Sequence, residues 1–265
     1  METEGSLKKL LGNSLVTSEG EKWSKLRKLA NHALHAESLK NMVPAMISSV
    51  EMMLERWKQH ECEEIEVFEE FRILTSQLIS MTTFGSSYLE EKDIFEMLTK
   101  LGIITSRNVF KIKLPIFSNP KKSTDDIESE KLEHGIRDSI LEIIKKRENA
   151  MTEVDNYGAD LLGLLVKAKI TVENVVDECK AFYIAGHETT TTLLACSVLL
   201  LAIHTDWQEE ARKEVLELFG QQDPHAEGIP RMKKYSQPFF ILLSSTLQGK
   251  FNEKSNWDNS FFRPI

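Results

Sequence analysis

The stretch that most limits the fold of this chain lies at residues 177–204 and reads DECKAFYIAGHETTTTLLACSVLLLAIH. Residues 193–203 are apolar almost all round, so a helix there is expected to be buried on every side. With helical spacing, five residues of the stretch share one face: Ala185, Glu188, Thr189, Thr192 and Cys196. A carboxylate and hydroxyls on one face of a buried helix predict a polar groove inside an apolar core.

The N-terminal half of this stretch also predicts a local distortion of the helix. Gly186 lowers helix stability, and a threonine hydroxyl can bond to the carbonyl four residues earlier. Together these features allow the helix to widen or bend at the groove.

Three other interpretations of the stretch compete with a groove. The threonines can bond only to their own backbone, with Glu188 paired to a buried Arg or Lys. A membrane span is the second, because seventeen uncharged residues separate Glu188 from Asp206, but the threonines make its first part too polar. The third is zinc: His187 and Glu188 begin the pattern H-E-x-x-H, but residue 191 is Thr, so no metal site is predicted.

Composition excludes several classes of protein. The 265 residues are 41% hydrophobic with a net charge of −8, which argues against a nucleic-acid partner. Cys62, Cys179 and Cys196 show no C-x-x-C spacing, so neither a disulfide framework nor a zinc module is indicated. The N-terminal apolar runs are too short for a signal peptide or a membrane anchor.

Long periodic segments with few glycines and prolines predict a mainly α-helical protein. The expected helices are residues 21–34, 37–60, 68–84, 89–109, 123–147, 161–168, a central helix from 171, and 206–219. Ser18 and Glu21 form a capping-box pattern before the first, and Asp206 is expected to cap the last. Residues 65–67 suggest a short strand or link, and residues 111–117 a non-helical connector.

Trp23 and Arg27 lie four residues apart in the first expected helix. A core tryptophan beside a surface cation explains them structurally, but an indole N–H and a guanidinium can also bind a carboxylate together. W-x-x-x-R flanked by LVTSEGEKW and RKLANHAL, AGHETT at residues 185–190, and FGSSY at residues 84–88 occur in order along the chain. In these motifs the chain resembles plant members of the cytochrome P-450 family of haem-thiolate monooxygenases.

The resemblance implies a partial cytochrome P-450 fold around a long buried central helix, with haem as cofactor and hydroxylation of a lipophilic small molecule as activity. Glu188 and Thr189 would deliver protons to the dioxygen that haem activates. Ala185 and Gly186 would leave room for the gas, while Trp23 and Arg27 would hold a haem propionate. It further implies an NADPH-cytochrome reductase as partner and, for a complete member, the cytosolic face of the endoplasmic reticulum membrane. Lys22, Lys25 and Lys28 have two interpretations: part of a docking face for the reductase, or solvated lysines on an ordinary amphipathic helix.

The resemblance covers residues 1–234 as the central part of a cytochrome P-450 domain, and residues 235–265 form a divergent tail. None of the three cysteines lies in the glycine-rich loop that supplies the family's thiolate. Glu209 and Arg212 match the family's E-x-x-R only formally, in a surface helix. The chain is therefore expected to be inactive by itself, without its own membrane anchor, which leaves a cytosolic location open. The alternative is a non-catalytic helical remnant or partner-binding protein.

Overall fold

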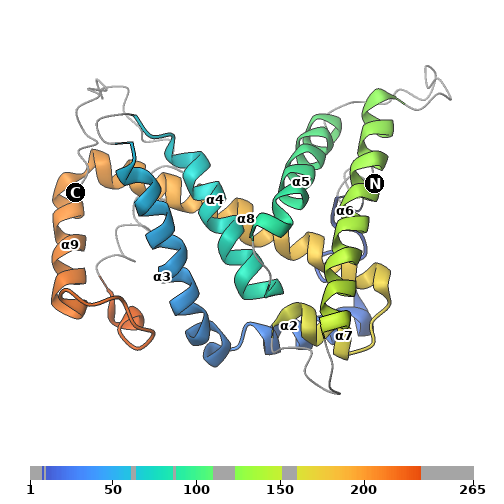
Figure 1. Ribbon diagram of the computed structural model, residues 1–265, viewed down its shortest axis with the longest axis horizontal. Helices are drawn as coiled ribbons and strands as arrows, with labels where there is room; N and C mark the ends of the chain where they lie inside the picture. The colour runs from blue at the N-terminus through green and yellow to red at the C-terminus, as the bar shows by residue number, and fades with distance from the viewer. Residues whose placement is uncertain are drawn as a thin grey trace. The chain divides into compact units, whose positions relative to one another are not determined.

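The structure is a computed structural model that describes residues 8, 10–60, 64–85, 88–109, 123–150 and 160–233. All regular structure in these residues is helical, as the sequence predicts (Figure 1). The helices are α2 (Gly20–Ala33), α3 (Ala36–Lys58), α4 (Val67–Ile79), η1 (Ser80–Phe84), α5 (Tyr88–Val109), α6 (Thr124–Ala150), α7 (Leu161–Lys167), α8 (Val172–Ile203), α9 (Thr205–Phe219) and η3 (Ile229–Arg231).

Helix starts differ from the expected caps. Glu19, not Ser18, precedes α2, and the Ser18 hydroxyl donates instead to the Asn13 carbonyl at 3.2 Å. His204 precedes α9, so Asp206 lies inside the first turn, where its charge favours the helix dipole. Residues 64–66 form an irregular link rather than a strand. The expected connector at residues 111–117 lies outside the described residues.

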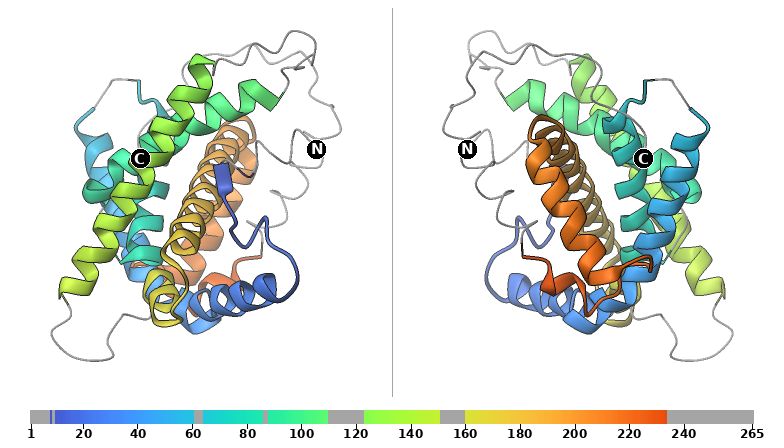
Figure 2. Two further views of the ribbon diagram at one scale, coloured as in Figure 1. Left: turned by 90° about the vertical axis from the view of Figure 1, so that its right-hand side faces the viewer. Right: turned by 90° about the vertical axis from the view of Figure 1, so that its left-hand side faces the viewer.

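The chain divides into two compact units, and the boundaries between them fall inside α3, α4 and α8. The first unit comprises residues 1–38 and 75–188. Its core joins α2, α5, α6, α7 and the first half of α8, and α5 packs against α6 (Figures 1 and 2). The largest side chains fully buried in this unit include Tyr183, Phe84, Ile94, Leu101 and Ile136. Tyr183 of α8 stacks on Phe84 at a ring distance of 4.3 Å and meets Phe95 edge-on at 4.8 Å, which fixes α8 against α5 and η1.

The end of α4 widens into the π-helical turn η1, which stops at Gly85. Gly85 has φ of 59°, a left-handed conformation that glycine adopts without strain. Arg147 of α6 donates to the Phe84 carbonyl and pairs with Asp160 at 2.5 Å. Asp160 also caps α7, accepting from the Gly163 amide at 2.9 Å. One guanidinium therefore ties η1, α6 and α7 together.

The second unit comprises residues 39–74 and 189–265. Trp57 of α3 packs against Phe71 of α4 with ring centroids 6.2 Å apart, and Arg56 pairs with Glu70 at 2.9 Å. The buried Glu214 of α9 accepts from the Lys233 amide at 2.7 Å, which holds the loop after α9 in place.

Helix α8 runs without interruption through residues 172–203. The distortion expected at Gly186 is absent from it, and the π-helical turn forms at the end of α4 instead. Burial on every side is not found either, because Leu193, Leu199 and Ile203 are exposed. The described elements cover only part of the circumference of α8. Among the described residues, α8 is the one helix long and apolar enough to cross a membrane, a test that core helices of soluble proteins also pass.

Candidate functional site

The five residues expected on one face of α8 do share a face, and that face is open. Ala185, Glu188, Thr189, Thr192 and Cys196 are all exposed, while His187 and Thr191 between them are buried. The polar groove expected inside the core is therefore an exposed stripe of one helix. The Glu188 side chain retains 49% of its accessible surface, so its carboxylate can exchange protons with water.

Gly186 lies beside the open stripe, on the side of α8 that meets the end of α4. A Cβ built on it would lie 2.1 Å from Ile79 Cδ1 and 2.8 Å from Ile79 Cγ1. Both distances are far below van der Waals contact, so the missing side chain lets α8 approach the end of α4. The geometry assigns Gly186 a packing role and leaves Ala185, on the open stripe, as the small residue beside Glu188.

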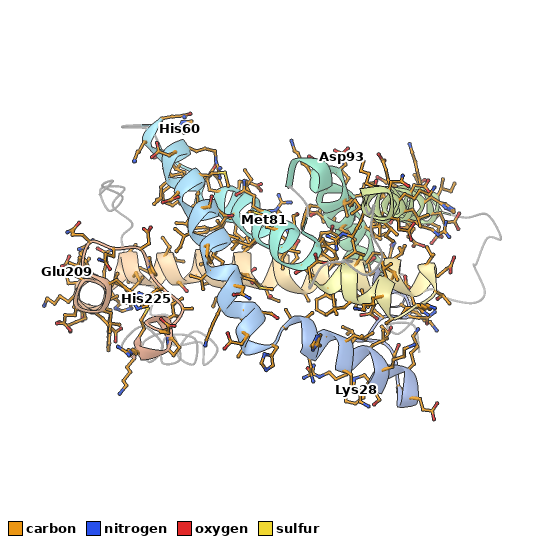
Figure 3. All side chains as sticks on the ribbon, turned by 60° about the horizontal axis from the view of Figure 1, so that its bottom comes forward. Lys28, His60, Met81, Asp93, Glu209 and His225 are labelled. Atoms are coloured by element: carbon orange, nitrogen blue, oxygen red, sulfur yellow. The ribbon has the colours of Figure 1, made fainter. Side chains whose placement is uncertain are left out.

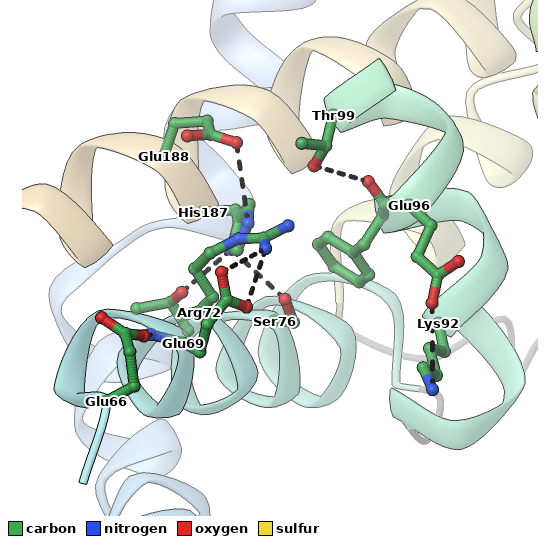
Figure 4. A network of polar contacts seen from close by, with 11 residues as sticks. Glu66, Glu69, Arg72, Ser76, Lys92, Glu96, Thr99, His187 and Glu188 are labelled. Carbon is green, nitrogen blue, oxygen red and sulfur yellow. Dashed lines mark hydrogen bonds and ion pairs between the residues drawn. The ribbon is translucent and has the colours of Figure 1, made fainter. Parts of the chain in front are cut away.

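His187 connects α8 to α4 through buried hydroxyls. Its Nδ1 lies 2.9 Å from Thr75 Oγ1 and 3.2 Å from Ser76 Oγ, and its ring meets Phe95 edge-on at 5.3 Å (Figure 4). Its Nε2 lies 3.7 Å from Glu188 Oε1. The sequence drew attention to His187 only as half of a zinc pattern. Among the described residues, no three His, Cys, Asp or Glu side chains come together as potential metal ligands.

The pair expected to hold a propionate lies on the surface of α2. Trp23 is 47% exposed, and Arg27 is exposed one turn later. Trp23 is therefore not the core anchor that a structural interpretation predicts; Leu26 and Ala30 are the buried residues of this helix. Both donors are open to a ligand carboxylate.

The N-terminal segment before α2 is fastened to the start of α8 by carboxylates. The Asn13 amide donates to Asp177 Oδ2 at 2.8 Å and the Leu15 amide to Glu178 Oε1 at 2.6 Å. Lys22 donates to the Asn13 carbonyl at 2.6 Å and to Asn174 Oδ1 at 2.8 Å. These bonds place α2, with its exposed pair, against the same unit core as the first half of α8.

Burial shifts the acidity of this junction. Glu178 is only 1% exposed, and desolvation raises its pKa to about 7. The hydrogen bond from the Leu15 amide and the charge of Lys22 oppose this rise, whereas the neighbouring Asp177 adds to it. The sequence gives no sign of this, because Glu178 sits among ordinary charged residues at the start of the helix.

The described cysteines both lie on α8, Cys179 buried and Cys196 exposed, and Cys62 lies outside the described residues. Neither described cysteine is in a loop. Arg212 and Glu209 form an exposed pair one turn apart on α9, in keeping with a surface helix.

A family profile described as "Cytochrome P450" matches residues 3–236. The chain belongs to the cytochrome P-450 family. This confirms the resemblance read from AGHETT and W-x-x-x-R.

Named relatives come from plants. Cytochrome P450 CYP749A22 of Panax ginseng is 61% identical over 94% of this chain and 49% of its own length. The 11-oxo-beta-amyrin 30-oxidase of Glycyrrhiza uralensis is 40% identical over 89% of this chain and 48% of its own length. The chain thus spans about half the length of the curated relatives it matches.

Solved structures confirm the fold. The heme domain of cytochrome P450DA matches with a TM-score of 0.76 at 22% identity, covering 90% of this chain and 53% of that one. A retinoic-acid-bound cyanobacterial CYP120A1 matches with a TM-score of 0.71 at 23% identity, covering 90% of this chain and 52% of that one. The described residues therefore form a partial cytochrome P-450 fold.

Proposed function

We propose that this chain supplies the oxygen-side half of a haem-dependent monooxygenase that hydroxylates a lipophilic small molecule. The observation that carries the proposal is the open stripe on α8, where Ala185, Glu188 and Thr189 are exposed just before the apolar second half of the helix. Family membership makes haem the group that fits this stripe. Bound haem supplies oxygen activation and electron transfer.

The residues present fit two contacts with haem. The exposed indole N–H of Trp23 and guanidinium of Arg27, one turn apart on α2, suit a propionate carboxylate. The methyl group of Ala185 leaves space above the stripe. The chain's sequence offers no cysteine in a glycine-rich loop as iron ligand, so we propose that these 265 residues are inactive by themselves.

In this proposal Glu188 and Thr189 move protons. The half-exposed carboxylate of Glu188 takes a proton from water, and the Thr189 hydroxyl, the next residue on the stripe, passes one on because it can donate and accept. We also propose an NADPH-cytochrome reductase as electron donor and, for a complete enzyme, the cytosolic face of the endoplasmic reticulum membrane. Two relatives are named 11-oxo-beta-amyrin 30-oxidase, which supports an oxidoreductase. Their name also supports an organic molecule as the class of substrate.

Thr189→Ala tests the proton role. We expect product formed per NADPH consumed to fall about tenfold or more, because the relay hydroxyl is lost. The measurement uses a chimaera in which residues 3–236 replace the matching part of the Panax ginseng relative. Thr189→Ser is the matched control, since it keeps the hydroxyl and should keep most of the coupling. Unchanged coupling in Thr189→Ala would show that the hydroxyl serves only its own helix.

Arg27→Ala tests the propionate contact in the same chimaera. A charge-assisted hydrogen bond contributes about 1.5–3 kcal/mol, so haem affinity is expected to fall roughly 10- to 100-fold. Haem content per protein, measured after gel filtration, reports the loss. Arg27→Lys keeps the charge but not the fork geometry, so its haem content should lie between those of Arg27→Ala and the unchanged chimaera. Full haem retention in Arg27→Ala would remove the propionate role.

A further inference from the structure

His187 is a buried ionisable residue that the proposed proton path does not use. It is 3% exposed and lies in the middle of α8, directly before Glu188. Thr75 and Ser76, consecutive residues of α4 that are also buried, both direct a hydroxyl at its Nδ1 (Figure 4). The edge-on ring of Phe95 closes a third side. The imidazole is therefore held by two helices besides its own.

The hydrogen-bond partners of the imidazole determine which of its two nitrogens carries the proton. A neutral imidazole carries one donor nitrogen and one acceptor nitrogen, and the partner of one nitrogen sets the role of the other. Two hydroxyls meet at Nδ1, and either can donate to it when it is the acceptor. The proton then resides on Nε2, which lies 3.7 Å from Glu188 Oε1. That distance exceeds a direct hydrogen bond but suits a dipole contact or a bridging water.

We propose that His187 is a positioning residue for Glu188: the Thr75 and Ser76 hydroxyls fix the imidazole with its proton on Nε2, and this N–H orients the Glu188 carboxylate on the open stripe. The inference rests on the proposed proton role of Glu188. In this inference the buried residue His187 affects an exposed residue of the same helix, Glu188. Because a buried N–H dipole acts at reduced dielectric, it restrains a carboxylate more strongly than water does.

The competing explanation is that His187 only ties α8 to α4. Two variants separate these explanations. The side-chain amide of Asn reaches about as far as Nδ1, so His187→Asn keeps a partner for the α4 hydroxyls but removes the donor near Glu188. His187→Gln places an amide N–H about where Nε2 lies. If His187 only connects α8 to α4, the Asn variant should keep more product per NADPH than the Gln variant. If His187 positions Glu188, the Gln variant should keep more.

The variants are measured in the chimaera with the ginseng relative. We expect His187→Gln to keep product per NADPH within about twofold, and His187→Asn to lower it about threefold or more at unchanged haem content. Adding His187→Asn to Glu188→Gln should cause no further loss, because the histidine acts through that carboxylate. Equal coupling in the Asn and Gln variants, or fully additive losses in the double variant, overturns the proposal.

A second readout does not depend on turnover. With ¹⁵N-labelled histidine in the reduced, carbon-monoxide-bound chimaera, the two ring nitrogens of His187 report the tautomer, assigned by the signals lost in His187→Gln. We expect a protonated Nε2 and an unprotonated Nδ1, with Thr75→Val plus Ser76→Ala allowing the other tautomer. A proton on Nδ1 refutes this inference and leaves the role of Glu188 intact. Unchanged coupling in Glu188→Gln refutes that role instead, whatever the tautomer.

Discussion

At the scale of single residues, Glu178 shows how burial changes a side chain's chemistry. Its carboxyl accepts from the Leu15 amide, so the charged form has a partner, yet desolvation still raises its pKa to about 7 from 4.5. The folded state therefore binds this proton more tightly than the unfolded state. Glu178 favours folding at low pH, and its contribution declines as pH rises between about 4.5 and 7.

Glu178→Gln should remove that decline. The shift corresponds to about 3 kcal/mol, so the variant should gain up to this amount of unfolding free energy relative to the natural chain at pH 8 and little at pH 4.5. Denaturant unfolding of both chains across this pH range measures the difference. Glu128→Gln, an exposed glutamate on α6, is the control and should track the natural chain. If the unfolding free energies of the Glu178→Gln variant and the natural chain change with pH in parallel, the expectation is contradicted.

At the scale of elements, α2 combines two surfaces. Lys22 is bound to Asn13 and Asn174 and so belongs to the junction with α8 rather than to a docking face. Lys25 and Lys28 are exposed and line an open groove with Glu21, Ser24 and Leu29, and Lys28 lies on the outer side of the helix (Figure 3). The expected set of three docking lysines is thereby reduced to two candidates.

Lys25→Glu with Lys28→Glu should slow electron transfer from the reductase. In the chimaera we expect about a tenfold lower rate at low ionic strength and a difference that shrinks as salt screens the charges. Lys131→Glu with Lys145→Glu on α6 makes the same change in net charge elsewhere on the surface. Equal rates and equal salt dependence for the two double variants would reject α2 as a docking face.

At the scale of the whole molecule, the residues proposed to contact haem lie on two helices, α2 and α8. The core of the first unit contains residues of α2 and of the first half of α8, the helix that carries the exposed stripe. The apolar residues Leu193, Leu199 and Ile203 are exposed on the same long helix. The described residues therefore include the proposed cofactor contacts but no cysteine in a loop.

The isolated 265-residue chain should not form a thiolate-ligated haem protein. Titration with haemin, reduction and addition of carbon monoxide should leave the thiolate–carbonyl Soret band absent, because none of the three cysteines has the glycine-rich sequence of the family's thiolate loop around it. The chimaera, prepared in parallel, is the positive control and should show the band. A stoichiometric band from the isolated chain would overturn the proposed inactivity.

The sequence by itself determined the helices and the register of the motifs. Apolar periodicity placed each described α-helix within a few residues, and Ala185, Glu188 and Thr189 of AGHETT share a face because helical spacing is local. The left-handed stop at Gly85 likewise follows from glycine alone. The sequence did not determine the helix caps. Ser18, expected to cap α2, donates its hydroxyl to the Asn13 carbonyl instead.

Only the tertiary structure decided which contacts Gly186, His187 and Glu178 make and how buried they are. Gly186 serves packing because Ile79 lies against it, and His187 meets Thr75, 112 positions away in sequence. Glu178 acquires a raised pKa only because the fold buries it, at a position where the amide of Leu15, 163 positions away in sequence, bonds to its carboxylate and opposes the rise. Contact and desolvation depend on which distant segments pack together. A local pattern fixes the face of a helix but not what that face meets.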